Sequence, residues 1–93
     1  MITQLNERKV PVIPLLSGTI VRWEKKDGVL VWPHEVLCII KPDIPAPISP
    51  EHKVYSPARG RLTIVKSFEK PGKWVRGRTI IAEIEVILAT TIV

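Results

Sequence analysis

The sequence has a single cysteine, no long apolar run and no basic leader, and each absence excludes a class of protein. Cys38 has no second cysteine with which to form an internal disulfide, which fits a reducing compartment such as the cytoplasm or an organelle matrix. No stretch reaches the roughly 18 consecutive apolar residues of a membrane-spanning helix, so we expect no membrane span. Residues 1–6 contain no basic segment leading into an apolar one, so we expect no signal peptide.

Signals for helices are scarce as well. Nine prolines and five glycines interrupt the 93 residues every few positions and leave no room for a long amphipathic helix. Between them lie short runs rich in β-branched residues, at residues 10–13, 18–23, 29–31, 36–40, 53–55, 61–66, 74–75 and 79–87. Together with an apolar share of 45% and a charged share of 25%, this pattern predicts one soluble all-β domain, folded as a sandwich or barrel.

The two halves of the chain repeat one pattern. Counted from Gly28 and from Gly72, a valine follows at +3, an apolar pair at +8 and +9, and an isoleucine at +12. Half-motifs of this size cannot bury their apolar faces alone, so we expect the halves to pair around one core. In that arrangement Val31 and Val75 point inward while their neighbours point outward.

Turn residues separate these segments. Asp27-Gly28 and Pro71-Gly72 are tight-turn dipeptides, in which glycine supplies a positive φ that other residues resist. Residues 42–50 contain four prolines, which predicts a stiff, extended loop that stays out of any sheet ladder and connects the halves.

Taken in order, these features resemble the biotinyl/lipoyl attachment domains of 2-oxo-acid dehydrogenases and biotin-dependent carboxylases, which also have two quasi-symmetric halves. The similarity covers about residues 12–86 and includes residues 18–23, 25–28, 35–38, 54–60, 80–81 and 84–85. It implies a flattened β-barrel or sandwich of two halves, a barrel-sandwich hybrid, with residues 1–93 as one domain and a tail at each end.

The resemblance also implies an attachment lysine at the tip of a hairpin between the halves, and here the sequence departs from the family. Counting forward from Cys38 places that position on Ile44, whereas counting backward from residues 56–57 places it on Ser49, so the hairpin is about five residues longer. Neither side chain supplies the primary amine that carries biotin or lipoate. Lys41 and Lys53 flank the loop and are weak substitutes, because the attaching ligase reads a tight turn. We therefore expect no bound cofactor.

A second departure concerns turns in which the family has glycine. His34 and Arg78 occupy those places, and Gly77 lies one residue early. This departure puts the local turn geometry in question and leaves the expected fold unchanged.

Catalytic and metal-binding candidates are few: His34, His52, Glu35, Glu51 and Asp43. General-base chemistry needs a pocket and a positioned partner, and nothing in the spacing of these residues indicates either. The two histidines are 18 residues apart and show no ligand spacing, and Cys38 is expected to be a small buried hydrophobe in mid-strand. We expect neither enzymatic activity nor a metal site.

Basic residues offer another function. The net charge is +5, of which +4 lies in residues 47–93. Residues 66–78 carry basic side chains with interleaved aromatics, namely Lys66, Phe68, Lys70, Lys73, Trp74, Arg76 and Arg78. Such a stretch can contact phosphates and stack on bases, or it can simply be a solvated turn region. A small basic nucleic-acid-binding β-barrel is therefore an alternative function.

Tryptophans and tails favour protein partners. Trp23 is expected to pack at the edge of the core, whereas Trp32 and Trp74 are out of phase with the inward valines and become candidate interface anchors. They could equally fold down over the ends of the barrel. Residues 86–93 form an apolar, β-prone tail, which must pair within the barrel, with a second copy or with another protein.

The sequence thus predicts a non-catalytic module of carrier-like fold, acting as an assembly or interaction subunit of a larger complex. Partner contacts are assigned to Trp32, Trp74, Arg76 and Arg78, and a homo-oligomer through the C-terminal tail is one expected arrangement. The first alternative is a true lipoyl or biotinyl carrier that uses an unorthodox lysine. The second is the nucleic-acid-binding barrel.

Overall fold

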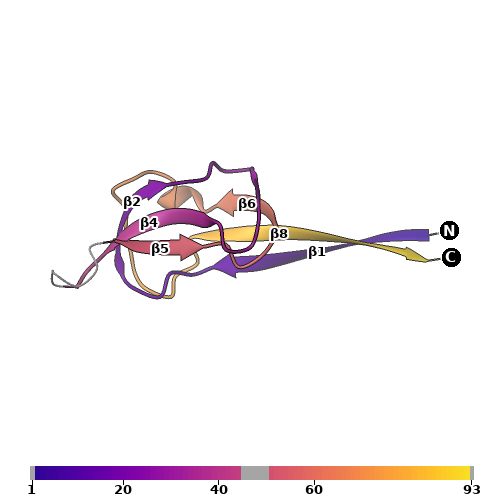
Figure 1. The fold of residues 1–93 in the computed structure, drawn as a ribbon, viewed down its shortest axis with the longest axis horizontal. Helices are drawn as coiled ribbons and strands as arrows, with labels where there is room; N and C mark the ends of the chain where they lie inside the picture. Colours follow the sequence, from indigo (N-terminus) through magenta and orange to yellow (C-terminus); the bar gives the residue numbers. More distant parts are fainter. Residues whose placement is uncertain (1, 45–50, 93) are drawn as a thin grey trace.

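The computed structural model describes residues 2–44 and 51–92, and nearly all regular structure in them is β-strand (Figure 1). In chain order the elements are β1 (Ile2–Val12), β2 (Gly18–Trp23), β3 (Leu30–Val31), β4 (Val36–Pro42), β5 (His52–Tyr55), β6 (Gly60–Ile64), the 3-10 turn η1 (Lys66–Phe68), β7 (Trp74–Val75) and β8 (Ala82–Ile92). No helix in this part of the chain is long and apolar enough to cross a membrane. The prediction of an all-β protein is confirmed.

The strands form two four-stranded antiparallel sheets, a layout compatible with a β-sandwich. One sheet has the order β1-β8-β6-β3 and the other has the order β5-β4-β2-β7. Each sheet takes strands from both halves of the sequence, so neither half forms a sheet by itself. Backbone bonds reinforce this exchange, because Gly28 N–H donates to Leu62 C=O at 2.7 Å and Gly72 N–H donates to Ile20 C=O at 2.8 Å.

The core lies between the sheets and contains the inward residues of every strand. Val31 and Val75 are 0% and 1% exposed, as their phase in the sequence predicts. The largest side chains around them are Ile20, Leu37, Ile40, Leu62, Ile81 and Ile84. Each such aliphatic side chain stabilises the fold by roughly 1.5–3 kcal/mol on burial. Trp23 packs against this cluster and donates its indole N–H to the Phe68 carbonyl at 2.8 Å, so its expected place at the core edge is confirmed.

Among the described residues, four in turns have positive φ. Gly28 and Gly72 have φ of 86° and 90°, as the turn dipeptides predict. His34 and Arg78 have φ of 70° and 67°, so two residues other than glycine also adopt the left-handed conformation. A left-handed conformation costs a non-glycine residue about 1–2 kcal/mol. Backbone bonds offset that cost, because His34 N–H donates to Ser56 C=O at 2.9 Å and Arg78 N–H donates to Pro14 C=O at 2.7 Å.

Several predicted boundaries are wrong. Residues 2–9, expected to be a tail, belong to β1, and the C-terminal tail pairs with β1 along its length, from Val12 opposite Ala82 to Ile2 opposite Ile92. Because the two terminal segments pair with each other, β1 and β8 are both longer than the sequence predicts. Lys66 starts a helical turn and is not the end of a strand.

Pro42 was predicted to lie outside the sheets, yet it ends β4 opposite Gly18. Proline lacks only the N–H group, so it is tolerated at a strand end. The remainder of the predicted Pro-rich loop, residues 45–50, lies outside the described residues.

Close backbone approach generates a prediction at Gly60. A Cβ at this position would collide with the carbonyl oxygen of Glu85, because β6 and β8 pair closely there. We expect Gly60→Ala to destabilise the fold by about 1–3 kcal/mol, as overpacking does. Thr63→Ala, at an exposed position on the same strand, should cost less than about 1 kcal/mol. Urea denaturation of both variants measures the difference, and equal midpoints would contradict the close contact.

Candidate functional site

Trp74 lies on β7, which pairs with the start of β2. Val75 is buried, so the alternation of the strand turns Trp74 and Arg76 outward. The indole is 55% exposed, and its Nε1–H donates to the Asp43 carboxylate. This bond orients the ring and leaves its surface open to a partner.

Two hydrogen bonds hold the turn that follows Trp74 against the loop between β1 and β2. Gly77 N–H donates to Ser17 Oγ at 2.7 Å, and Arg78 N–H donates to the Pro14 carbonyl. Arg76 and Arg78 are both exposed, and neither forms an ion pair with another described residue.

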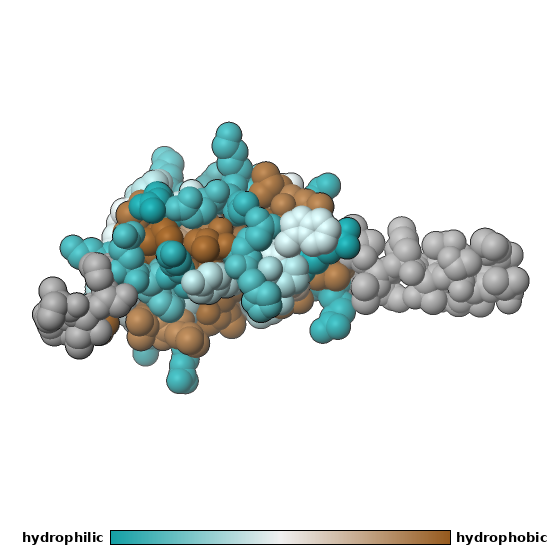
Figure 2. Space-filling model, in the orientation of Figure 1, coloured by the Kyte–Doolittle hydropathy of each residue, from teal (hydrophilic) through white to brown (hydrophobic). Residues whose placement is uncertain are grey.

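The same region exposes apolar side chains. Leu15 is 74% exposed and Leu16 is 38% exposed, and Ile44 follows Asp43 with 40% exposed. Figure 2 shows apolar surface at this end of the body, which is on the left in the view. We call this region the Trp74 surface and define it as Leu15, Leu16, Ile44, Trp74, Arg76 and Arg78. It combines an aromatic anchor, aliphatic side chains and cations, which is the composition of a protein interface.

Trp32 has different neighbours. Its backbone N–H donates to Glu35 Oε1 at 2.7 Å, and the Arg59 guanidinium lies 4.1 Å from the centre of its ring. A cation–π contact at an exposed site contributes about 0.5–1 kcal/mol. The indole is 48% exposed, and Arg59 covers one of its faces. Trp32 is therefore less available to a partner than Trp74.

The two tryptophans lie at opposite ends of the body. Trp74 pairs with Thr19, next to the rung where Gly18 faces the end of β4. Trp32 follows β3, which pairs with the start of β6 where β8 leaves the body (Figure 1). The two indoles therefore do not share one surface, because β3 and β7 belong to different sheets and pair at opposite ends.

Lysines near the predicted hairpin lie on strands. Lys41 is opposite Thr19 on β4, and Lys53 is opposite Ile39 on β5. Both side chains are exposed on paired strands, whereas the carrier chemistry needs an amine on a turn. Ile44 is the last described residue before the loop, and Ser49 lies outside the described residues.

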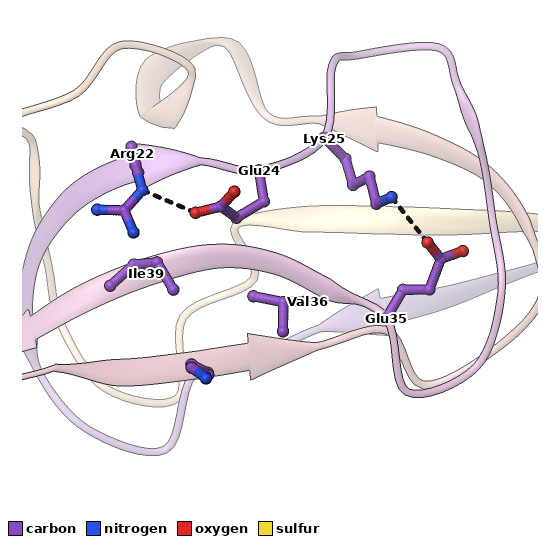
Figure 3. A pocket seen from close by; sticks show the side chains of 7 residues that line it. Arg22, Glu24, Lys25, Glu35, Val36 and Ile39 are labelled. Carbon is purple, nitrogen blue, oxygen red and sulfur yellow. Dashed lines mark hydrogen bonds and ion pairs between the residues drawn. The ribbon is translucent and has the colours of Figure 1, made fainter.

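A shallow groove crosses β2, β4 and β5 (Figure 3). It has a volume of about 510 Å³ and is lined by Arg22, Glu24, Lys25, Glu35, Val36, Ile39 and Lys53. Its carboxylates are paired, because Arg22 Nε lies 2.7 Å from Glu24 Oε1 and Lys25 Nζ lies 2.7 Å from Glu35 Oε2. Arg22 also approaches Glu51 at 3.8 Å.

Electrostatics in this groove favour the charged form of Glu35. The hydrogen bond from Lys25 and the backbone N–H of Trp32 hold the pKa of Glu35 below its ordinary value of 4.5. A carboxylate stabilised in this way is a poor proton acceptor at neutral pH, and its role is to tie Lys25 to the Trp32 turn. His34 lies beside Glu35 in sequence, but the Glu35 carboxylate contacts Lys25 and the backbone N–H of Trp32.

Cys38 is a structural residue of the core. Cys38 is fully buried in β4, and burial raises the pKa of its thiol to about 12, so it is protonated at neutral pH. Its predicted place as a buried hydrophobe is confirmed. No group of three or more His, Cys, Asp or Glu side chains in residues 2–44 and 51–92 is placed to hold a metal ion.

The basic stretch is also less suited to stacking than its sequence suggests. Phe68 packs against the core and is half-buried, so it is not one of the free interleaved aromatics. Lys66, Lys70 and Lys73 are exposed around η1 and the turn before β7.

No protein-family model matches this chain, and a search of curated proteins found no relative.

The Glu35 contacts give a prediction about pH. Because the folded-state pKa is depressed, the stabilisation from this carboxylate is present above pH 4.5 and is lost as the pH falls through the lower folded value. An NMR titration of the Trp32 backbone amide should show a midpoint below 4.5. Lys25→Met should move that midpoint upward, since the first cause of the depression is removed. A midpoint that does not respond to Lys25→Met would count against this account.

Proposed function

We propose that this chain is a non-catalytic module of the biotinyl/lipoyl-carrier type that binds a protein partner in a larger complex through its Trp74 surface. The observation that carries the proposal is the exposed Trp74 indole, oriented by Asp43 among exposed aliphatic and basic side chains.

Matched backbone bonds support the carrier-type fold with two quasi-symmetric halves. The bond from Gly28 to Leu62 has a counterpart from Gly72 to Ile20, and the bond from His34 to Ser56 has a counterpart from Arg78 to Pro14. In each pair the donors are 44 residues apart, as are Gly28 and Gly72, and the acceptors are 42 apart, as are Gly18 and Gly60. Two half-motifs that exchange strands and bonds in this way are the arrangement of a barrel-sandwich hybrid.

The placement of the lysines supports binding over carrying. Lys41 and Lys53 project from paired strands, where a lipoyl or biotinyl arm would have to leave a regular ladder. Ile44, at one counted attachment position, contributes an exposed apolar side chain beside Asp43. In the family, this end of the domain presents the cofactor. In this chain it presents the apolar and basic side chains of the Trp74 surface.

Electrostatics favour an acidic or amphipathic protein partner. Arg76 and Arg78 follow Trp74 in sequence and add cations to the apolar side chains of the Trp74 surface. A rim of charge around an apolar centre steers association and fixes the register of the complex. The nucleic-acid alternative has weaker support, since Phe68 is packed against the core.

Substitution of Trp74 tests the proposed function. Tagged protein is purified from the cells that make it, the retained partner is identified, and binding is measured with both proteins purified. We expect Trp74→Ala to weaken binding about thirtyfold, as loss of an anchor residue does, with little change in melting temperature because the side chain is exposed.

Trp32→Ala is the matched control, because it removes the same side chain from the opposite end and should leave binding intact. Unchanged affinity in Trp74→Ala, or loss of affinity only in Trp32→Ala, would refute the Trp74 surface. Steep weakening of the complex with salt, and retention on nucleic acid, would favour the nucleic-acid-binding alternative.

Intact mass spectrometry separates the proposal from the carrier alternative. The two counted attachment positions are Ile44 and Ser49, and neither is a lysine. We therefore expect the mass of the protein from its native cells to show no lipoyl or biotinyl addition. Peptide mapping should find Lys41 and Lys53 unmodified. A lipoylated or biotinylated peptide would establish a carrier and overturn the proposal.

A further inference from the structure

β8 has a strand on each side only for part of its length. β6 pairs with it from Ala82 to Glu85, whereas β1 continues beside it to Ile92. From Val86 to Ile92 the strand therefore has β1 on one side and no strand of the described chain on the other. Figure 1 shows this part as a two-stranded ribbon that extends beyond the sheets. An isolated two-stranded ribbon is marginally stable in water, so a further strand would stabilise it.

The hydrogen bonds of Leu62 identify which backbone groups face the open side. Its N–H donates to Val29 C=O at 2.9 Å and its C=O accepts from Gly28 N–H at 2.7 Å, so the Leu62 backbone faces away from β8. In an antiparallel ladder the next residues face the other way, which pairs Arg61 with Glu85 through both their backbone groups.

This alternation continues along β8. Glu85 faces β6, so Ile87, Ala89 and Thr91 direct their N–H and C=O groups to the open edge, while the residues between them face β1. The open edge thus presents three residues whose paired donors and acceptors have no ladder partner in the described chain.

The other sheet edges are short or carry charges or proline over part of their length, and the open edge of β8 has none of these features. β3 and β7 have two residues each, and β5 has four residues and carries Lys53. The outer edge of β1 carries Glu7 and Lys9 together with Pro11, which has no N–H to offer. Short strands, charges and proline are the usual protection against edge-to-edge pairing. Residues 86–92 contain no charge, no proline and no glycine, so nothing in their sequence prevents another strand from pairing with this edge.

We propose that the open edge of β8 pairs with the same edge of a second copy, antiparallel and centred on Ala89. In this register Ala89 lies opposite the partner's Ala89, and Ile87 lies opposite the partner's Thr91. All three are the residues that face the edge, so each rung exchanges both of its backbone hydrogen bonds. The uncharged segment has no like charges to repel across the two-fold axis, and a small residue lies at its centre.

The product is a four-stranded sheet with the order β1-β8-β8-β1. Its two outer edges are the two copies of β1, each of which carries Glu7, Lys9 and Pro11 where the ribbon joins the body. Closed two-fold symmetry uses up the open edges, so association stops at a dimer. The dimer does not depend on the proposed function, because the ribbon and the Trp74 surface lie at opposite ends of the body.

Proline at the centre of the edge tests the dimer. Ala89→Pro removes the N–H that faces the open edge, and Leu5→Pro is its control, because Leu5 is directly opposite Ala89 and its N–H faces the outer edge of β1. Light scattering after gel filtration of the full 93-residue chain, over a wide range of concentration, should give twice the chain mass of 10.5 kDa. Ala89→Pro should give the mass of one chain, and Leu5→Pro should stay at twice that mass.

Amide exchange of the unaltered protein guards against variants that fail to fold. In the dimer the amides of Ile87, Ala89 and Thr91 should exchange slowly, whereas those of Thr3, Leu5 and Glu7 on the outer edge of β1 should exchange fast. A monomer at every concentration, equal loss of mass in both proline variants, or fast exchange at Ile87 and Ala89 would overturn the proposal. Protection that develops only when a different protein is added would overturn the second copy as the occupant.

Discussion

Both sheets depend on backbone hydrogen bonds between the two halves of the chain. Gly28 bonds to Leu62 of the second half, and Gly72 bonds to Ile20 of the first. β3 and β7 are too short to persist alone, and each is held against a strand of the other half. Separated halves would expose their apolar faces and leave these groups unpaired, so the domain is one cooperative unit.

The same exchange places the Trp74 surface. The turn after β7 is tied to the first half through Pro14 and Ser17, which brings Arg76 and Arg78 beside the exposed leucines of the β1–β2 loop. Segments about sixty residues apart therefore meet at one end of the body. The corresponding turn at His34 is tied to Ser56 and holds Trp32 under Arg59 at the other end. Equivalent turns thus produce two ends with different chemistry, one open and one partly covered.

The two proposals are compatible in space. The Trp74 surface lies where β4 ends, and the ribbon of β1 and β8 leaves from the opposite end (Figure 1). A dimer formed through the ribbons would present two Trp74 surfaces pointing away from each other, each free to hold a partner. Such a dimer would be bivalent, so a partner that carries two binding sites would gain affinity through effective concentration.

By itself the sequence determined the strand content, the inward phase of Val31 and Val75, the tight turns at Gly28 and Gly72 and the burial of Cys38. These follow from local rules, because side-chain alternation and backbone φ are set by each residue and its neighbours. Only the tertiary structure decided that residues 2–8 and 86–92 pair with each other, that Pro42 lies opposite Gly18, and that Trp32 and Trp74 lie at opposite ends. Strand pairing joins residues far apart in the chain, so its register depends on the whole core and not on any local pattern.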